Sequence, residues 1–440
     1  MVVGRFRSMH RLWLLVLVCA LLEFGGTTPS TFAAENLRVW VRTNNVDLFK
    51  AIAAEYIKEN EGVEIEVTPD GGAVEKLTVA VLGGVAPDLV EIGGTQAPML
   101  ALDGLIQPIT RFAEQDGLSV KDFWPATYYR GWFEGELYSL PVNADANFIF
   151  VWYKRMFEEA GLDGETPPRF ISDLDEYNRR LSQRDPAGRL VRIGIVPWYQ
   201  YREANSALTW AWAFGGGFFD EERWAVTATH PNNLAMFEWM LGLAQQYPPS
   251  EVDPLRGSEY MHIWNKTAAM SLMVGDQIFT LRLTHPDELI GIGAMPYHPE
   301  TGPEHPEWVG GWNMAIPVNA RNAERAWDFM RFALASPMGT SIQYPAASGH
   351  TAVWYPGYRK APLYQQYLET GDILHVVAQN LLANAQFFPP RLTVPLDLAR
   401  TVRDVVEQRM APMAALERLQ AETEQRLAED MARRRAQQSE

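Results

Sequence analysis

The chain contains a single cysteine among its 440 residues, and this residue, Cys19, lies in the first 33 residues, which have the features of a cleavable leader. Once the leader is removed, no thiol remains for a disulfide, a thiolate metal site or a cysteine nucleophile. Stability must then come from packing. The composition allows this, since 47% of the residues are hydrophobic and 12% are aromatic. These fractions predict a globular protein of two or three domains rather than a disordered chain.

Hydrophobic runs long enough to cross a membrane are also lacking. The run Leu12–Leu22 falls short of the roughly 18 to 20 residues that span a bilayer. Arginines precede it, and a polar stretch ending at Ala33 and Ala34 follows, which is the three-part plan of a signal peptide. Residues 1–33 are therefore predicted to be a leader, and the mature protein to be exported to the periplasm or the extracellular face of the cell membrane.

Cys19 offers an alternative to cleavage near Ala33, because a Gly-, Thr- and Ser-containing tether follows it and a lipid could be attached there. The residue before it is Val18. Bacterial lipoprotein processing prefers a small side chain at that position. Cleavage near Ala33 is the interpretation that the sequence favours.

Positive charge is scarce, with 38 Lys and Arg against 54 Asp and Glu and a formal net charge of -16. Loss of the leader, which has three Arg and one Glu, makes this about -18. Such a charge excludes nucleic acid as a natural partner and favours a neutral or cationic ligand.

Motifs of catalysis and cofactor binding are missing as well. The sequence has no P-loop, nucleophile elbow, zinc-protease helix or dinucleotide fingerprint, and Gly215-Gly216-Gly217 lacks the flanking strand that a phosphate cradle requires. The eight histidines have no metal-ligand spacing. We therefore expect no cofactor, no metal site and no enzymatic activity.

Alternating strands and helices are present from the start of the mature chain. Apolar residues alternate over 37–41, 63–67 and 87–92, and they recur at helical spacing over 48–57 and 74–81. This order predicts an α/β fold with a largely parallel sheet. Ligands of such sheets bind beyond the carboxyl ends of the strands. Four polar candidates for ligand contacts lie on the loops at these strand ends: Arg42, Asn44, Thr95 and Gln96.

The middle of the chain is rich in rings. A strand is predicted over 193–197, and it places Trp198 and Tyr199 at its end, either as ligand contacts or as core residues. Trp210, Trp212 and Phe214 have the spacing of a helix with one buried face, for which packing is the favoured interpretation.

Three blocks resemble the family 1 extracellular solute-binding proteins, the maltose-binding-protein-like group. In residues 143–162, an apolar run ends in tyrosine and the helix that follows ends in Glu-Ala-Gly-Leu. Residues 268–276 read AAMSLMVGD, and residues 308–334 read WVGGWNMAIPVNARNAERAWDFMRFAL. Two helices around Pro412 resemble the family's closing pair, followed by a charged tail over 431–440. Lys154 and Asp276 depart from the family's usual residues, which bears on the ligand more than on the fold.

The resemblance implies a two-lobed periplasmic-binding-protein fold, type II-like, in which each lobe is a sheet flanked by helices and the ligand binds between the lobes. One lobe is expected to comprise 36–143 and 290–335, and the other 144–289 and 336–440. The chain would cross near Asn143, Ile290 and Ser336.

A sugar is bound by flat apolar faces beside planar polar groups. Trp312, which follows Gly310 and Gly311, is the main aromatic candidate, because glycines allow close backbone approach. The polar candidates near the crossing are Asn143 and Asp145, and the resemblance adds Asp276, Ser348 and His350. The same residue types also serve as turn residues and helix caps, Arg42 could pair with a surface acid, and Trp312 could be a core residue behind a tight turn.

The function expected from the resemblance is capture of a sugar or oligosaccharide by lobe closure and delivery to the transmembrane subunits of an ABC permease, by a protein that is monomeric and makes or breaks no bond. Two alternatives stay open. The same receptor could carry a polyamine or a glycerophosphodiester, or the chain could be a secreted glycoside hydrolase, which needs two carboxyl groups at a set distance.

Overall fold

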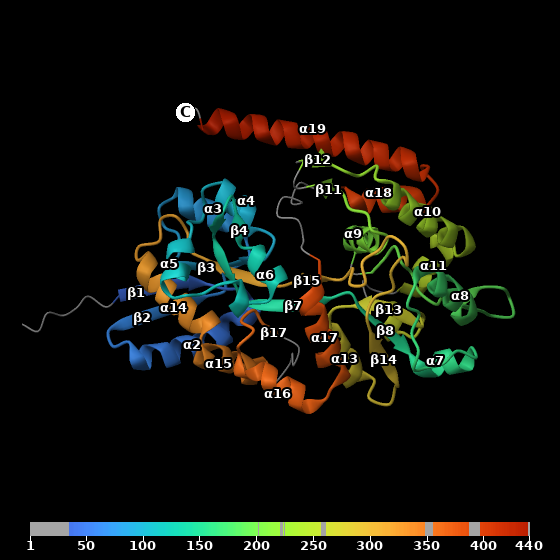
Figure 1. The fold of residues 1–440 in the computed structure, drawn as a ribbon, viewed down its shortest axis with the longest axis horizontal. Helices are drawn as coiled ribbons and strands as arrows, with labels where there is room; N and C mark the ends of the chain where they lie inside the picture. The colour runs from blue at the N-terminus through green and yellow to red at the C-terminus, as the bar shows by residue number, and fades with distance from the viewer. Residues whose placement is uncertain are drawn as a thin grey trace, which may run out of the picture.

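A computed structural model describes residues 35–200, 202–220, 223, 225–256, 261–347, 355–386 and 397–438. The predicted leader, Ser348 and His350 lie outside the described residues. The chain forms two lobes joined by crossing strands (Figure 1).

The first lobe is built on a five-stranded sheet with the order β2-β1-β3-β16-β6. Its strands are β1 (Glu35–Trp40), β2 (Val63–Thr68), β3 (Leu89–Gly93), β6 (Ser139–Pro141) and β16 (Trp312–Ala315). β1 is parallel to β2 and β3, whereas β16 is antiparallel to β3 and β6. The three strands and two helices predicted from the first 60 residues of the mature chain are confirmed.

Helices cover this sheet, and a small hairpin lies beside it. The hairpin consists of β4 (Trp132–Phe133) and β5 (Glu136–Leu137). The helices are η1 (Thr43–Asn45), α2 (Val46–Glu59), α3 (Val74–Leu82), α4 (Ala97–Leu102), α5 (Thr110–Gln115), η2 (Val120–Asp122), α6 (Pro125–Tyr129), α14 (Ala323–Ala335), α15 (Pro337–Ala347) and α16 (Pro362–Thr370). Helix α14 covers the end of the block 308–334 and buries Trp327 and Phe329.

The second lobe has an antiparallel sheet, β13-β8-β14, made of β13 (Met270–Met273), β8 (Ile149–Tyr153) and β14 (Ile290–Gly293). The central strand β8 is buried along its whole length, as its unbroken apolar sequence indicates. The other elements of this lobe are α7 (Lys154–Glu159), α8 (Ile171–Leu181), β9 (Gln183–Arg184), β10 (Leu190–Arg192), α9 (Glu203–Ala213), β11 (Phe219–Asp220), β12 (Ala225–Val226), α10 (Pro231–Gln246), α11 (Pro249–Arg256), α12 (Met261–Trp264), α13 (Gly275–Thr284), α18 (Leu398–Val406) and α19 (Pro412–Gln438).

Three short strands connect the lobes. β7 (Asn143–Asn147) leads from β6 to β8, β15 (Trp308–Gly310) leads from β14 to β16, and β17 (Tyr355–Pro356) pairs with the other side of β7. Helix α17 (Ile373–Asn384) packs against β7, β14 and β15 (Figure 1).

The lobe boundaries differ from the expected ones at two places. β14 pairs with β8, so residues 290–293 lie in the second lobe, and the chain returns to the first sheet only through β15. In this arrangement β14 pairs with the backbone N–H and C=O groups along one edge of β8. A strand located in the first lobe could not reach those groups. Helices α15 and α16 remain with the first lobe, because α15 packs against α2 and α14 and α16 packs against α15.

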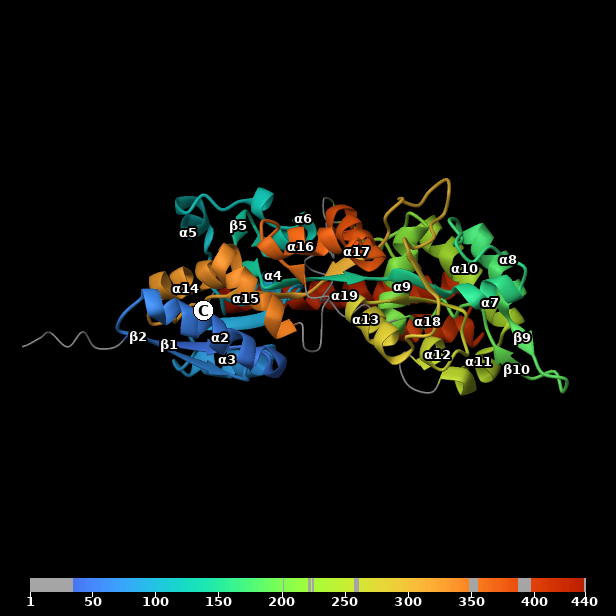
Figure 2. The ribbon, with the colours of Figure 1, turned by 90° about the horizontal axis from the view of Figure 1, so that it is seen from below.

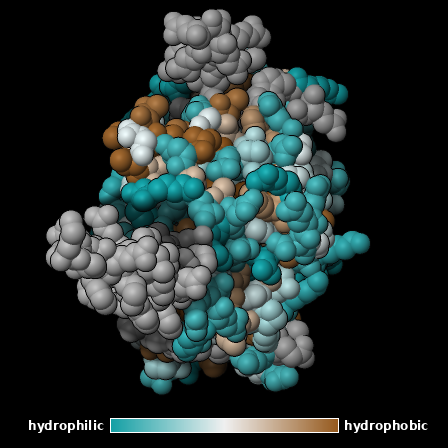
Figure 3. All heavy atoms as spheres, turned by 90° about the vertical axis from the view of Figure 1, so that its left-hand side faces the viewer, coloured by the Kyte–Doolittle hydropathy of each residue, from teal (hydrophilic) through white to brown (hydrophobic). Residues whose placement is uncertain are grey.

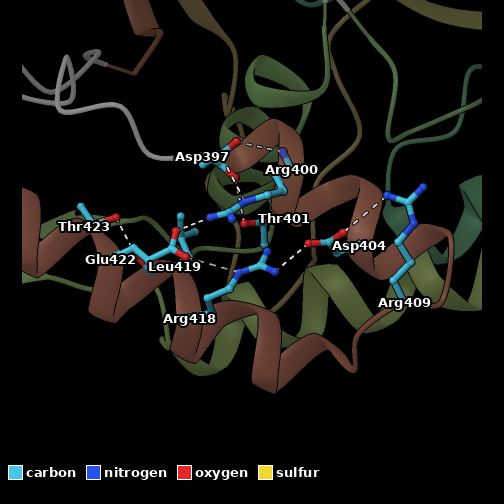
Figure 4. A network of polar contacts seen from close by, with 9 residues as sticks. All are labelled: Asp397, Arg400, Thr401, Asp404, Arg409, Arg418, Leu419, Glu422 and Thr423. Atoms are coloured by element: carbon cyan, nitrogen blue, oxygen red, sulfur yellow. Dashed lines mark hydrogen bonds and ion pairs between the residues drawn. The ribbon is translucent and has the colours of Figure 1, made fainter.

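The C-terminal helix α19 runs from the second lobe to a position above the first lobe (Figures 1 and 2). The charged tail noted over 431–440 is helical as far as Gln438, where α19 ends. Its first turns are tied to α18 by ion pairs (Figure 4). Within the described residues, no helix combines the length and the apolar character that a membrane span requires.

Candidate ligand-binding site

Three segments that are far apart in the sequence meet at one edge of the first sheet. β1 ends just before Arg42, β3 ends in the turn Gly93-Gly94, and Trp312 opens β16. β16 runs antiparallel to β3 and pairs Trp312 with Gly93, so the start of β16 lies at the carboxyl end of β3. This strand direction brings Trp312 to the loops where the sequence placed the polar candidates.

A buried carboxylate, Glu91, organises this edge. Its Oε2 accepts the backbone N–H of Arg42 at 2.8 Å, and its Oε1 accepts from Arg42 Nε at 3.1 Å and from Asn45 Nδ2 at 2.6 Å. Burial raises the pKa of Glu91, while the neighbouring Arg42 charge and the donated hydrogen bonds oppose that rise. The carboxylate can therefore be buried because donors surround it.

Trp312 packs against the same arginine. The guanidinium carbon of Arg42 lies 4.0 Å from the centre of the Trp312 ring, which is a cation–π contact. Gly72, at φ +83°, leaves room for the ring, because a Cβ there would lie 3.0 Å from Trp312 Cζ3. The ring is half-buried, so part of its surface is accessible at the junction of the lobes.

Asn143 and Asp145 lie on the crossing strand β7, next to Trp312. The buried Asn143 accepts the backbone N–H of Trp312 on Oδ1 at 2.9 Å and donates from Nδ2 to Asp145 Oδ1 at 2.5 Å. Gly311 has φ +119°, and a Cβ at this position would lie 2.3 Å from the carbonyl oxygen of Asn143. This close approach explains the glycine before Trp312, and it brings the amide of Asn143 and, through it, the carboxylate of Asp145 next to the backbone of Trp312.

Arg130 is a buried cation in the same cluster. It donates to the carbonyl oxygens of Val309 at 3.1 Å and Gly310 at 2.9 Å, and Gly94 leaves it space, since a Cβ there would lie 2.8 Å from Arg130 Cζ. Burial lowers the pKa of Arg130 to about 10, and the charge of Asp145 opposes this shift. Arg130 is therefore charged at neutral pH and links α6 to the crossing strand β15.

The cluster lies within a region of the chain that matches a known protein family. The bacterial extracellular solute-binding protein family matches residues 42–339, which is more than half of the chain and includes Arg42, the crossing strand β7 and Trp312. The chain belongs to this family.

Individual relatives of this solute-binding protein are distant. A maltotriose-binding protein from Pyrococcus abyssi is 24% identical over 306 residues, which are 68% of this chain and 62% of the relative. The chain spans about half the length of another curated relative that it matches, 51%.

Solved structures share the fold. The sugar-binding protein MalE of Xanthomonas citri aligns with a TM-score of 0.74 at 16% identity, over 90% of this chain and 98% of that one. UgpB of Mycobacterium tuberculosis, in complex with glycerophosphocholine, aligns with a TM-score of 0.68 at 16% identity, over 90% and 99%. Both likenesses bear on the two-lobed fold alone.

The candidates of the second lobe are less clearly placed for binding. The predicted strand 193–197 forms only a bridge from Ile193 to Ala268, because side chains of Asn178 and Ser182 take the N–H groups of Ile195 and Gly194. Trp198 is buried in the second core. Tyr199 is half-buried, with the guanidinium carbon of Arg256 3.7 Å from its ring centre.

Other candidates are scattered or not described. Asn44 is exposed on η1, while its neighbour Asn45 contacts Glu91. Gln96 Oε1 accepts from the N–H of Gly93 at 2.7 Å, which closes the turn that carries the half-buried Thr95. The side chain of Asp276, at the start of α13, lies outside what the structure describes, as do Ser348 and His350.

Three residues of the cluster were missed by the sequence reasoning: Glu91, Asn45 and Arg130. Glu91 had a detectable signal, since a carboxylate stands inside the buried strand β3. Arg130 had none, because its partners are backbone carbonyls 179 and 180 residues away. Within the described residues, no group of three His, Cys, Asp or Glu side chains could hold a metal ion.

Proposed function

We propose that this solute-binding protein captures a sugar or an oligosaccharide between its two lobes and delivers it intact to the transmembrane subunits of an ABC permease. The observation that carries this proposal is the half-buried Trp312 at the lobe junction, with Arg42 against its ring and Asn143 and Asp145 beside it. Relatives named for maltotriose binding and for sugar binding support the same class of ligand.

The arrangement suits the chemistry of a sugar. An indole offers a flat apolar surface to the C–H groups of a pyranose, and a neighbouring carboxylate accepts hydrogen bonds from hydroxyl groups. Trp312 and Asp145 supply these two elements, and Asn143 fixes their relative position through one hydrogen bond to each.

Capture follows from closure of the lobes about β7 and β15, which are the described strands that lead directly from one sheet to the other. The first moving body comprises the described residues of 35–142 and 312–370, and the second comprises the described residues of 149–293 and 398–438. A ligand that contacts both bodies favours the closed form by its differential affinity for the two forms.

The proposed role includes no bond-making step. A glycoside hydrolase needs one carboxyl group as an acid and another as a nucleophile or base. At the junction, Glu91 is enclosed by Arg42 and Asn45, which leaves it unable to approach a substrate. Among the side chains that the structure describes at the junction, Asp145 alone does not make the required pair.

The alternative cargo is a polyamine or a glycerophosphodiester, and the two differ in what the site offers them. A polyamine would use Asp145 and the acidic charge of the chain. A phosphodiester would need an unbalanced cation, whereas the charge of Arg42 is balanced by Glu91 and that of Arg130 by Asp145. The same pairing engages Asp145, so the described charges of the cluster favour neither alternative over the other.

The mature protein is proposed to act as a monomer, exported to the periplasm or the outer face of the cell membrane and released near Ala33. Attachment of a lipid to Cys19 is the alternative. The mass of the protein purified from its native membrane fraction distinguishes a chain beginning at Ala34 from a lipid-bearing chain beginning at Cys19.

Thermal unfolding of the chain from Ala34 tests the class of ligand. The panel contains monosaccharides, oligosaccharides, polyamines and glycerophosphodiesters. A ligand at a hundredfold excess over its dissociation constant should stabilise the native state by about 2.7 kcal/mol. A saturable shift with a saccharide that is recovered intact supports the proposal; a shift with a polyamine alone refutes the sugar, and product formation refutes the receptor.

A further inference from the structure

An aromatic pocket lies on the first lobe, apart from the candidate site. It has a volume of about 420 Å³ and is lined by residues of α5, α6, the hairpin β4-β5 and the segment that includes the start of η2. In Figure 2, α5, β5 and α6 lie along one side of the first lobe, while α2 and α3 lie along the other. None of its lining residues belongs to the cluster around Trp312.

Three rings line this pocket from different directions. Tyr128 is buried and stacks on Phe123, with ring centroids 5.3 Å apart. The rings of Tyr129 and Trp132 each lie 6.1 Å from that of Tyr128 and are inclined to it by 72° and 59°. Tyr129 is 46% exposed on a lobe whose outer end is mainly hydrophilic (Figure 3), so its ring is open to a ligand.

The charge of the pocket is negative. Its lining has one carboxylate, that of Glu114, and no Lys, Arg or His. Burial raises the pKa of the Tyr128 hydroxyl, and the negative charges of Asp122 and Glu114 raise it further, so both carboxylates lie near this ring. Asp122 is paired with Lys360, whereas the described residues include no ion-pair partner for Glu114.

Cations of the neighbouring elements are engaged elsewhere. The guanidinium carbon of Arg111 lies 4.4 Å from the ring centre of Phe112, and Arg130 donates to the carbonyl oxygens of Val309 and Gly310. An anionic ligand would therefore meet a carboxylate and no cation in the pocket lining. A cationic ligand would meet the same carboxylate and the negative faces of the rings.

The hydroxyl groups of the lining are already used by the protein. Thr110 Oγ1 accepts the N–H of Leu137 at 2.8 Å and donates to Glu136. Ser119 Oγ donates to Asp122 at 3.3 Å. A sugar would find few partners for its hydroxyl groups here, and a primary ammonium group has three N–H donors to satisfy. A quaternary ammonium group has no donor, and its methyl groups pack on aromatic faces.

We propose that this pocket binds the quaternary ammonium group of an organic cation between the rings of Tyr129 and Trp132, beside Glu114. The rings hold the positive charge by cation–π contacts, and the carboxylate balances it. Arg130, which follows Tyr129 in the sequence, is buried against β15. The pocket is thus separate from the saccharide site, and the proposal does not depend on what the cleft binds.

Calorimetric titration of the chain from Ala34 with choline tests this proposal. The matched ligand control is the neutral analogue in which a carbon atom replaces the nitrogen, because it keeps the shape and loses the charge. We expect saturable binding of choline and binding of the analogue that is weaker by about tenfold or more. No binding of choline, or equal binding of the two compounds, overturns the proposal.

Two exposed side chains supply the protein variants. Glu114→Gln removes the charge and Tyr129→Leu removes the ring, and each should weaken choline binding about three- to tenfold. The unfolding midpoint of the ligand-free protein should not change. Tyr129→Phe keeps the ring and Glu64→Gln changes an exposed carboxylate of β2, so both should retain the affinity. Equal losses in Tyr129→Phe and Tyr129→Leu would show a contact with the hydroxyl and overturn the cation–π assignment.

The cleft and the pocket are distinguished by crossed titrations. Choline should bind equally well to Trp312→Ala; loss of choline binding there, with full binding to Glu114→Gln, places the cation in the cleft and overturns the proposal. Saccharide binding should be unchanged in Tyr129→Leu, and a weakened saccharide affinity assigns the pocket to the sugar instead. A parent protein that binds choline but no saccharide refutes the proposed function alone.

A quaternary ammonium group can belong to a free solute or to a lipid headgroup. Sedimentation with phosphatidylcholine vesicles separates these sources, with phosphatidylglycerol vesicles as the control. Cosedimentation that Glu114→Gln abolishes supports the headgroup as the ligand, and choline binding without cosedimentation supports a free solute. Cosedimentation that is the same in Glu114→Gln and the parent protein, without choline binding, overturns the proposal.

Discussion

The guanidinium group of Arg42 packs on the ring of Trp312, 4.0 Å from its centre, while its Nε donates to the buried Glu91 at 3.1 Å. One arginine thus ties the aromatic surface of the candidate site to a carboxylate inside the first sheet. The contact joins the ends of β1 and β3 to the start of β16, more than 200 residues later in the sequence. Several measurable consequences follow from this cluster.

Loss of the Trp312 ring should weaken ligand binding strongly. Trp312→Ala removes the flat apolar surface. We expect the binding free energy to weaken by about 2 kcal/mol, which raises the saccharide dissociation constant ~30-fold in calorimetric titration. Trp239→Ala is the control, since Trp239 is also half-buried but lies on α10, where it donates to Asp175 at 2.7 Å. Equal affinities of Trp312→Ala and the parent protein contradict the assignment.

Neutralising the buried carboxylate should cost stability. Glu91→Gln keeps the shape but leaves the Arg42 charge without its acid and turns one acceptor into a donor facing other donors. The free energy of unfolding in urea should fall by about 2–4 kcal/mol. Glu64→Gln, at an exposed position of β2 in the same sheet, should change it by less than about 0.5 kcal/mol.

Arg130 should be sensitive to a substitution that keeps its charge. Arg130→Lys retains a cation but cannot place two N–H groups on the carbonyls of Val309 and Gly310. We expect a loss of about 1–3 kcal/mol in the free energy of unfolding and weaker ligand binding, because β15 leads directly to Trp312. Arg169→Lys, at an exposed site, should be neutral in both measurements; the same result for Arg130→Lys would refute its role at the crossing.

A histidine next to the crossing strand should make stability depend on pH. The carboxylate of Glu307, whose Oε2 lies 3.5 Å from His305 Nδ1, raises the pKa of His305 against the opposing effect of burial. A raised folded-state pKa gives stabilisation that is fully present below the unfolded value of about 6.5 and is lost as pH rises through the folded value.

The corresponding experiment compares the parent protein with His305→Gln. The parent should be the more stable by up to about 1 kcal/mol at pH 5.5, and this advantage should shrink by pH 9. Urea unfolding at both pH values measures the two differences. An advantage of the same size at both pH values would show that His305 does not act through its charge.

The secondary structure of the first lobe could be predicted because its elements are locally encoded. Strands β1, β2 and β3 and helices α2, α3 and α14 follow from alternation or helical spacing within a few residues. The strand expected at 193–197 failed for a non-local reason, since the side chains of Asn178 and Ser182 bind backbone groups that a strand would pair.

The site could be predicted only where a local pattern pointed to it. Trp312 follows two glycines, and Asn143 and Asp145 stand at a recognisable crossing. The partners of Arg42 and Arg130 depend on which strands become neighbours, and a single sequence does not encode that pairing locally. For the same reason, the sequence placed β14 in the wrong lobe, although its type as a strand is ordinary.

Calorimetric titration of the chain from Ala34 with the saccharide that most stabilises it tests the central claim most directly. We expect saturable binding of one saccharide per chain, chemical recovery of the same saccharide afterwards, and much weaker binding to Trp312→Ala. Binding that is unaffected by Trp312→Ala, or conversion of the saccharide into products, would contradict the account.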